Sequence, residues 1–305
     1  MSRVAVLGVP SSAGARRTGQ ERAPQLLRQR GLMERLSSAG LDLVDCGDLP
    51  ETVFHADLQN PKQQNIGLVG AVARLVADRV FEAVRNETRV VVLGGDCTIT
   101  LGVLDGLGRH FSNLGLLYFD GDIDLNTPAD TTSGILDGMV IAHIVGKGAH
   151  ELTHMSSHYP LLPESNIVLF GFNADSGWID PPEVQRLKES SMIQYPLNEI
   201  RGKAESASRK ALTQLEARVD QILVHFDVDV IDFSDFPGAD VPHEHGLSLR
   251  EAVQALKVFV SSPKFIGLVI TEFNADRDAD GTLAMRLADN LADVLRCGHT
   301  RWTKM

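Results

Sequence analysis

Cysteines and long apolar runs are both scarce in this chain of 305 residues. It has three cysteines, Cys46, Cys97 and Cys297. This odd, small number of thiols excludes a disulfide-stabilised scaffold and favours a reducing compartment. No apolar run approaches the roughly 18 residues that span a bilayer, and the first residues lack a secretory leader. We therefore expect a soluble, cytoplasmic protein.

Basic residues are in deficit, with 29 Lys and Arg against 40 Asp and Glu and a formal net charge of −11. A negative chain repels nucleic acids and anionic membrane surfaces, which argues against both as partners. The charge fits a cationic small molecule or a metal ion, although many soluble enzymes are acidic for solubility alone. Hydrophobic residues make up 43% of the chain, enough for a substantial core.

Short apolar runs recur along the whole chain and predict strands. They lie at 4–10, 41–47, 89–95, 114–120, 166–172, 222–230 and 265–270, with a weaker eighth at 191–195. Because they are continuous rather than alternating, we expect a parallel sheet buried on both faces. Apolar residues three and four positions apart predict helices between them, for example at 21–40, 66–87 and 248–262. Alternating strands and helices predict an α/β fold with helices on both faces of the sheet, and the absence of a linker predicts one domain, 1–305.

Carboxylates follow the predicted strands, at the edge where ligands bind in such sheets. Asp120, Asp122 and Asp124 alternate after one apolar run, and Asp227 and Asp229 alternate after another. If the strands continued through these residues, the side chains of each set would point to one face. Crowded anions require a counter-ion, because burying an unpaired charge is costly.

A single aspartate after a strand is more often a turn or helix-cap residue than a ligand. Two D-x-D patterns at two strand ends are harder to explain as caps, and they favour a metal site. Carboxylates suit Mn²⁺ or Mg²⁺, whereas a thiolate from Cys97, which follows the run at 89–95, would favour Zn²⁺ or Fe²⁺. This many carboxylates could hold two ions, an arrangement that activates water at neutral pH.

Five motifs resemble, in order, those of the arginase/agmatinase (ureohydrolase) family. They are GGDCT (94–98), DGDIDLNTP (120–128), TTSGILDGM (131–139), FDVDVID (226–232) and TEFN (271–274). The resemblance implies a single three-layer α/β/α domain with a mostly parallel eight-stranded sheet. It also implies two Mn²⁺ ions, with another divalent metal left open, and hydrolysis of a small guanidino substrate. A homo-oligomer, a trimer or hexamer, is implied as well.

The resemblance also assigns roles to single residues. The implied metal ligands are Cys97, Asp120, Asp122, Asp124, Asp227 and Asp229. Asn126 and Ser133 match residues that hold the substrate α-carboxylate, and Asp180 and Glu183 match acids that meet its α-amino group. The implied catalytic residues are Asp124, which orients the activated water, Glu272, which pairs with the guanidinium, and Asp137, which stands where the family has a proton-shuttle histidine.

Four positions depart from the family pattern. Cys97 and Asp122 stand where the family has two ligand histidines, Asp137 replaces the shuttle histidine, and Val241 stands where threonine is common. Cysteine and aspartate are anionic when they bind a metal, so they would lower its Lewis acidity and raise the pKa of bound water.

Other histidines of the chain have two interpretations each. His225 could support the metal ligands, but a histidine packed beside a strand is the more frequent case. His243 and His245 could reach the site and replace a lost histidine, but a solvated loop is the more frequent case. His143 cannot replace the shuttle histidine, because six positions along a helix from Asp137 would place it on another face.

Two functions remain open. The first is a metal-dependent amidinohydrolase acting on a guanidino or modified-guanidino amino acid, such as arginine or N-hydroxyarginine. Asn126 favours an amino acid, because agmatine-specific members generally lack it. The second is an arginase-like protein that has lost hydrolysis and acts in ligand binding or regulation. The replaced histidines favour the second, and the retained carboxylates favour the first, because without a cation their repulsion would destabilise the protein.

Overall fold

The computed structural model describes residues 3–85, 88–156 and 158–302. Eight strands form one sheet in the order β2-β1-β3-β8-β7-β4-β5-β6, with parallel pairing throughout. The strands are β1 (Arg3–Gly8), β2 (Asp42–Asp48), β3 (Arg89–Leu93), β4 (Leu114–Phe119), β5 (Ile167–Phe170), β6 (Ile193–Tyr195), β7 (Gln221–Asp227) and β8 (Phe265–Thr271). Each overlaps one of the apolar runs, so the predicted parallel α/β sheet is confirmed.

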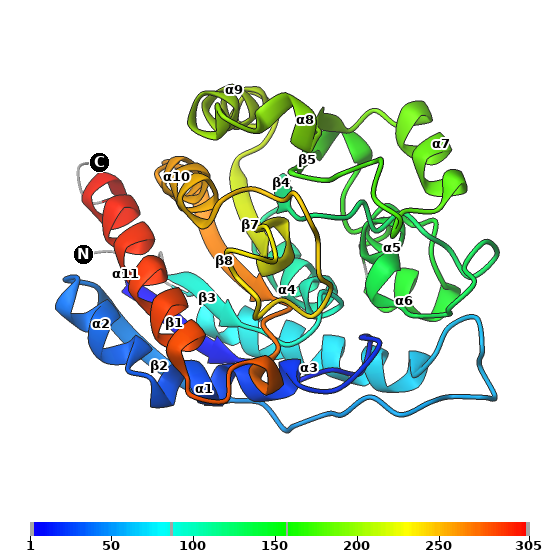
Figure 1. Cartoon of the computed structure of the whole chain (residues 1–305), viewed down its shortest axis with the longest axis horizontal. Coiled ribbons are helices and arrows are strands. Elements are labelled where there is room, and N and C mark those ends of the chain that lie inside the picture. Colours follow the sequence, from blue (N-terminus) through cyan, green and yellow to red (C-terminus); the bar gives the residue numbers. More distant parts are fainter. Residues whose placement is uncertain (1–2, 86–87, 157, 303–305) are drawn as a thin grey trace.

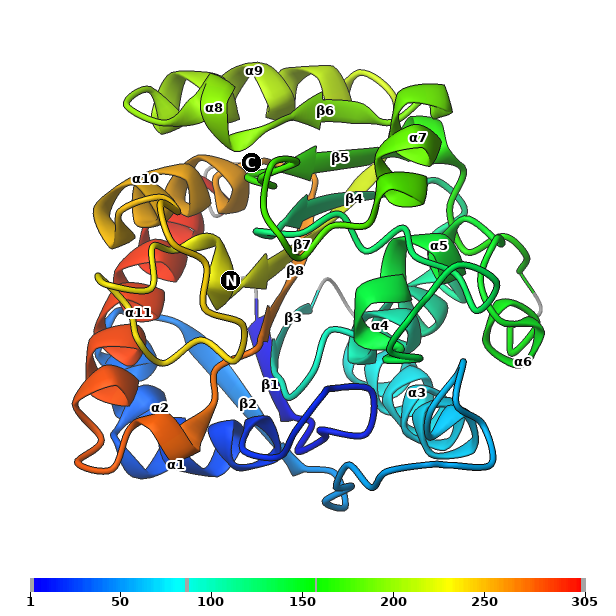
Figure 2. The same cartoon turned by 45° about the vertical axis from the view of Figure 1, so that its right-hand side comes forward.

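Helices cover both faces of this sheet and form the outer two layers (Figures 1 and 2). One face packs against α1 (Ala23–Gln29), α2 (Leu32–Ser38), α8 (Leu197–Ile200), α9 (Ala204–Glu216), α10 (Leu249–Val260) and α11 (Thr282–Trp302). The other packs against α3 (Ile66–Ala83), α4 (Ile99–Gly108), α5 (Val140–Ile144), α6 (His150–Thr153) and α7 (Pro181–Glu189). The predicted three-layer arrangement is confirmed, and two apolar cores lie between its layers.

Two local expectations were wrong. The segment 21–40 forms two helices, because Gly31 adopts a left-handed conformation with φ of 80° between α1 and α2. Strand β2 lies at the edge of the sheet, and its residues are exposed or half-buried instead of buried on both faces. An edge strand has a neighbouring strand on one side only, so the rest of the molecule covers its side chains less completely.

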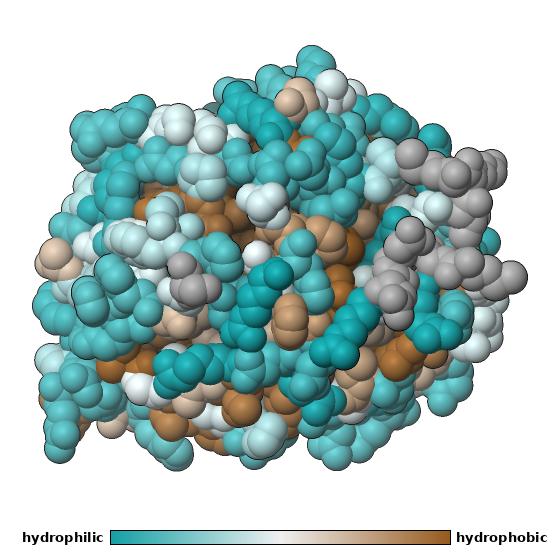
Figure 3. Space-filling model, turned by 180° about the vertical axis from the view of Figure 1, so that it is seen from behind, coloured by the Kyte–Doolittle hydropathy of each residue, from teal (hydrophilic) through white to brown (hydrophobic). Residues whose placement is uncertain are grey.

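The face of the molecule opposite to the view of Figure 1 is largely polar. Figure 3 shows one face of the molecule, where hydrophilic side chains predominate and hydrophobic ones show between them. Within the described part of the chain, none of the helices has the length and apolar character that crossing a membrane requires.

Four neighbouring strands position the site. Strands β3, β8, β7 and β4 are consecutive in the sheet and parallel, so their carboxyl ends meet at one edge. The segments beginning at Gly94, Glu272, Val228 and Asp120 leave the sheet at that edge. The motifs singled out in the sequence therefore converge in space.

Candidate metal centre and substrate pocket

A pocket of about 290 Å³ lies at this edge of the sheet. The predicted site residues that line it are Cys97, Asp120, Asp122, Asp124, Asn126, Ser133, Asp137, Asp180, Glu183, Asp227 and Asp229. The carboxylate of Glu272 lies beside it, within 4.8 Å of donor atoms of Cys97 and Asp137. The structure thus brings every predicted site residue to one place.

The two D-x-D patterns are turns and not continued strands. Strand β4 ends at Phe119, and Asp120 Oδ1 accepts a hydrogen bond from the backbone N–H of Asp122 at 2.7 Å. Strand β7 ends at Asp227, whose Oδ1 accepts from Asp229 N–H at 2.8 Å. The expectation that alternation along a strand aligns these carboxylates was therefore wrong. Aspartate ends the strand because its side chain bonds the backbone two residues on.

This turn chemistry leaves one oxygen of each aspartate for the pocket. Asp229 is held by a backbone N–H from a distant part of the chain, because its Oδ1 accepts from Gly121 N–H at 3.1 Å while Oδ2 faces His243. The second oxygens of Asp120 and Asp227 point toward Cys97 and His225. The capping role and the candidate ligand role therefore coexist in the same side chains.

The first group of candidate ligands combines sulfur, nitrogen and oxygen. Donor atoms of Cys97, Asp120, His225 and Asp227 all lie within 4.8 Å of one another, and all four residues are buried. The Cys97 thiol donates to Asp227 Oδ2 at 2.8 Å and lies 3.5 Å from His225 Nε2. Burial, reinforced by Asp227, raises the pKa of this thiol well above its usual range, so it carries its proton when no cation is near.

The second group is Asp122, Asp229 and His243. His243 Nε2 lies 3.2 Å from Asp122 Oδ2 and 3.5 Å from Asp229 Oδ2. Burial alone would lower the pKa of His243, but the two carboxylates outweigh it and raise the pKa to about 11. His243 is 5% exposed, so the expectation of a solvated loop residue was wrong for it.

The third group is Cys97, Asp137 and Glu272. Asp137 Oδ1 accepts from the backbone N–H of Cys97 at 2.7 Å, which fixes the carboxylate over the start of α4. Glu272 follows β8 with a left-handed φ of 61°, and its Oε2 accepts from Gln20 Nε2 at 3.2 Å. Such a backbone conformation is costly for a residue other than glycine and is typical of functional sites.

The charge of the pocket fits a bound cation. Within the ranges that the structure describes, the buried carboxylate oxygens without a hydrogen-bond partner are Asp120 Oδ2, Asp122 Oδ1 and Glu272 Oε1. Burial, with repulsion between neighbouring carboxylates, raises the pKa of Asp120 and Glu272 well above the usual range. A divalent ion would satisfy these oxygens and offset the repulsion, since carboxylate, imidazole and thiolate are all ligands of divalent metals.

Asp124 lies in the pocket but outside the three groups. Its backbone is left-handed with φ of 51°, and the Tyr118 hydroxyl donates a hydrogen bond to Oδ2. Burial, with repulsion from Asp120 and other carboxylates, raises its pKa well above the usual range. The tyrosine thus holds Asp124 at the wall of the pocket beside the candidate ligands.

The outer part of the pocket is polar and contains the residues expected to bind an amino acid. Asn126 Nδ2 donates to Asp180 Oδ2 at 2.9 Å. Glu183 accepts from Asp180 N–H at 3.1 Å through Oε1 and from Leu125 N–H at 3.0 Å through Oε2. Burial raises the pKa of Glu183 to about 7. Both carboxylate oxygens of Glu183 accept hydrogen bonds from backbone N–H groups, so this side chain fixes the start of α7 and the loop that carries Asn126.

Sequence reasoning missed Arg16, which also lines the pocket. Its guanidinium lies 5.3 Å from the ring centroid of Trp178, a residue that is 42% exposed. Sequence alone could not place it, because an arginine in a loop does not reveal where its side chain ends.

His143 and His245 do not reach the pocket. His143 Nδ1 donates to Met139 O at 2.7 Å within the buried part of α5, and burial lowers its pKa to about 4. His245 is exposed and adopts a left-handed φ of 67°. The expectation that His143 does not replace the shuttle histidine agrees with this placement.

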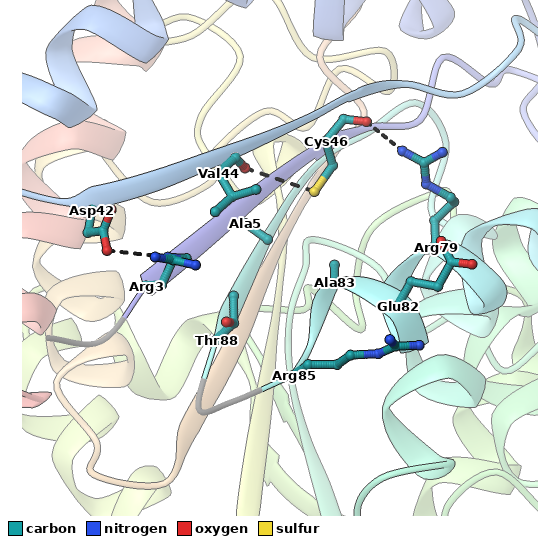
Figure 4. Close-up of a pocket in the computed structure, with 10 residues that line it drawn as sticks. All are labelled: Arg3, Ala5, Asp42, Val44, Cys46, Arg79, Glu82, Ala83, Arg85 and Thr88. Atoms are coloured by element: carbon teal, nitrogen blue, oxygen red, sulfur yellow. Dashed lines mark hydrogen bonds and ion pairs between the residues drawn. The ribbon is translucent and has the colours of Figure 1, made fainter.

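A second pocket, of about 500 Å³, lies elsewhere, against β2 and the end of α3 (Figure 4). Its arginines have local partners, since Arg3 donates to Asp42 and Arg79 donates to the backbone oxygen of Cys46. None of the predicted site residues lines it. Although this second pocket is larger, the chemistry of the lining residues favours the acidic pocket as the functional site.

Comparisons with known proteins agree with the motifs. The sequence model described as Arginase family matches residues 2–296. The arginase of Bacillus subtilis (strain 168) is 29% identical over 293 residues, which cover 94% of this chain and 97% of that protein. The solved structure of arginase from Bacillus caldovelox matches with a TM-score of 0.89 at 26% identity, and that from Bacillus cereus with 0.87 at 27%; each match covers 97% of this chain and 98% of the other.

Proposed function

The chain belongs to the arginase family, whose members are hydrolases of C–N bonds in linear amidines, and from this premise we propose a specific activity. The chain is a metal-dependent amidinohydrolase that acts on a guanidino amino acid such as arginine or N-hydroxyarginine. The observation that carries this proposal is the acidic pocket. Partnerless carboxylate oxygens lie at its buried end, and groups suited to an amino acid lie at its outer end.

Side chains from three strand ends would hold the metal. Two divalent ions are proposed, Mn²⁺ or another divalent metal, with ligands from Cys97, Asp120, Asp122, Asp124, Asp227 and Asp229. When bound, divalent ions lower the pKa of a water molecule to near neutrality and so supply the nucleophile. Asp124, held by Tyr118, would orient that water toward the guanidinium carbon.

Glu272 would bind the cationic head of the substrate. Gln20 donates to one of its oxygens, and the other, Oε1, has no partner and is free to accept from a guanidinium N–H. A guanidinium beside this buried carboxylate would stabilise its charged form, which burial alone disfavours. The glutamate would therefore fix the guanidinium close to the carboxylates of Asp137 and Asp227.

Asp137 would transfer the proton to the leaving amine. One oxygen of Asp137 accepts a hydrogen bond from the Cys97 backbone N–H. Burial, together with repulsion from the neighbouring Asp96, raises the pKa of Asp137 well above the usual range. A carboxyl group with a raised pKa can carry a proton at neutral pH and act as a general acid. This replaces the histidine that the family uses for the same step.

The outer end of the pocket would select an amino acid. Asn126 and Ser133 offer hydrogen bonds to a carboxylate, Arg16 adds a positive charge, and Asp180 offers an acceptor to an ammonium group. Agmatine lacks the carboxylate and would leave these donors unpaired. We therefore expect arginine or N-hydroxyarginine to be preferred over agmatine.

Product release by the protein loaded with divalent metal, either Mn²⁺ alone or Zn²⁺ together with Mn²⁺, tests this proposal. We expect urea from arginine, or hydroxyurea from N-hydroxyarginine, and a rate reduced roughly 100-fold or more in Glu272→Gln, because an electrostatic contact to the reacting group is lost. Asn126→Ala should raise KM for arginine by about tenfold, as expected for about 1.4 kcal/mol, and leave any agmatine turnover unchanged. Metal-loaded protein that releases neither product would contradict the proposal.

A family member that has lost hydrolysis is the second candidate. Asp137 in place of the shuttle histidine and the apolar Val241 in the pocket wall favour it. Such a protein would bind arginine in a calorimetric titration while releasing no urea or hydroxyurea, so binding and turnover measured on one preparation separate the two candidates.

A further inference from the structure

We propose that His225 and His243 are metal ligands and that they divide the centre into two chemically unlike positions. One position would combine the thiolate of Cys97 with the imidazole of His225, and the other would combine carboxylates with the imidazole of His243. The inference rests on the proposed function only in placing divalent metal in this pocket.

The first position is enclosed by four donor atoms. Cys97 Sγ is 3.5 Å from His225 Nε2 and 2.8 Å from Asp227 Oδ2, and His225 Nε2 is 3.6 Å from Asp120 Oδ2. Ligands around a tetrahedral ion at bond lengths of about 2.0–2.3 Å are roughly 3.3–3.7 Å apart, and both distances from His225 Nε2 fall in this range. The shorter distance from Cys97 Sγ to Asp227 Oδ2 is that of a thiol hydrogen bond, which loss of the thiol proton to a metal would remove. Asp120 Oδ2 is buried, has no hydrogen-bond partner and faces this group, which gives the group an independent reason to take up a cation.

The His225 ring is held so that Nε2 faces these atoms. Its other nitrogen, Nδ1, lies 2.8 Å from Thr100 Oγ1, and the ring stacks on Tyr118 with centroids 4.1 Å apart. Donation of Nδ1–H to the threonine leaves a lone pair on Nε2, which is the arrangement of most metal-bound histidines. The Thr271 hydroxyl lies 3.2 Å from this nitrogen, and a metal ion would replace it as the partner of Nε2. The side chain is completely buried, so the ring has little freedom to turn away.

The second position lies over the loop that follows β4. His243 Nε2 is within 3.5 Å of one oxygen from each of Asp122 and Asp229, and Asp122 Oδ1 is buried with no hydrogen-bond partner. A methyl group at Gly121 would meet His243 Cδ2 at 2.9 Å and Asp229 Oδ1 at 3.0 Å. The imidazole therefore fits against a backbone that only glycine leaves open.

Each imidazole lies beside one of the two residues that replace the family's ligand histidines. His225 is next to Cys97, and His243 is next to Asp122. The chain thus keeps two imidazoles at the centre, supplied from β7 and from the loop after it, and adds a thiol and a carboxylate. The centre as a whole has more anionic ligands without having fewer nitrogen ligands.

This ligand set predicts different metal preferences for the two positions. Thiolate and imidazole suit Zn²⁺, Co²⁺ or Fe²⁺, whereas two carboxylates with one imidazole suit Mn²⁺ better than thiolate does. We therefore infer that the centre binds one thiophilic ion at the Cys97–His225 position and one Mn²⁺ at the Asp122–His243 position.

Cobalt spectroscopy tests the first position on the whole chain. The first equivalent of Co²⁺ should produce a sulfur-to-cobalt charge-transfer band, which Cys97→Ser removes. His225→Gln should weaken Co²⁺ binding tenfold or more, since losing a ligand costs at least as much as losing a residue that supports one. His143→Gln, which changes a buried histidine outside the pocket, should leave the band and the affinity unchanged. Absence of the band in the unmodified protein would overturn this part.

Pulsed electron paramagnetic resonance tests the second position. With one equivalent of Zn²⁺ bound first, added Mn²⁺ should show coupling to an imidazole nitrogen. This coupling should be lost in His243→Gln and kept in His245→Gln, which changes an exposed histidine in the same loop. If His243 only neutralises the carboxylates as a cation, the unmodified protein would bind Mn²⁺ without nitrogen coupling, and the assignment would be wrong.

Failure of the inference and failure of the proposed function give different results. Product release without the cobalt band and without nitrogen coupling would refute the ligand assignment and leave the amidinohydrolase in place. Both spectroscopic signals without product release would support the ligands and refute the hydrolase.

Discussion

At the scale of single residues, the aspartates of the pocket each have two contacts of different kinds. One oxygen of Asp120, Asp227 and Asp229 accepts a backbone N–H, and the other faces the candidate metal position. The sequence reveals that acids follow strands, but not that a single carboxylate can both end a strand and face a cation. The site therefore depends on turn geometry, which residue spacing alone does not show.

His143 is a residue whose buried, neutral state should be visible in the pH dependence of stability. Its pKa is lowered to about 4, against 6.5 for an ordinary histidine. Between those values the unfolded chain binds a proton that the folded chain does not, so the free energy of unfolding falls as the pH falls. The loss should reach about 3 kcal/mol near pH 4.

The variant His143→Asn should not lose this free energy of unfolding as the pH falls, because asparagine keeps a donor for Met139 O but does not titrate. Unfolding in urea between about pH 7 and about pH 4 measures the difference between the two proteins. A difference that stays constant over this range would show that His143 is not buried in its neutral form.

At the scale of elements, the strands could be predicted from sequence better than their ends. Each of the eight apolar runs overlaps a strand, because continuous hydrophobic segments separated by helices have few other ways to be buried. The course of residues 120–128 could not be predicted, because backbone bonds to Asp120 and the left-handed Asp124 set it. The same holds for His243, which contacts Asp122 over a sequence separation of 121 residues.

The turn after β4 should tolerate no side chain at Gly121. Gly121→Ala would place a methyl group against His243 and Asp229, so we expect lower affinity for Mn²⁺ with the fold retained. Gly138→Ala is the matched control, because this glycine also lines the pocket and a methyl group there meets nothing within 4 Å. Equal Mn²⁺ affinity of the two variants in a calorimetric titration would argue against the position assigned to His243.

At the scale of the whole molecule, the fold and family could be predicted from ordered motifs, and the chemistry of this member less so. The parallel three-layer architecture and the arginase family are confirmed. The ligand roles, the substrate and the oligomer of three or six copies stay predictions. Sequence reasoning identified the replaced histidines at 97 and 122, but it left open whether His225 and His243 reach the candidate ligands, because deciding that requires the tertiary structure.

The central claim is that the acidic pocket exists to bind divalent metal for hydrolysis. Elemental analysis of the protein, purified without chelator and reconstituted with Zn²⁺ and Mn²⁺, tests it most directly, with Asp227→Asn beside it. This variant keeps an oxygen for the Asp229 N–H but removes a charged ligand from the pocket. The account predicts about two ions per chain in the unmodified protein, as in a two-metal hydrolytic site, and fewer in the variant. A protein that takes up no metal after reconstitution would contradict it.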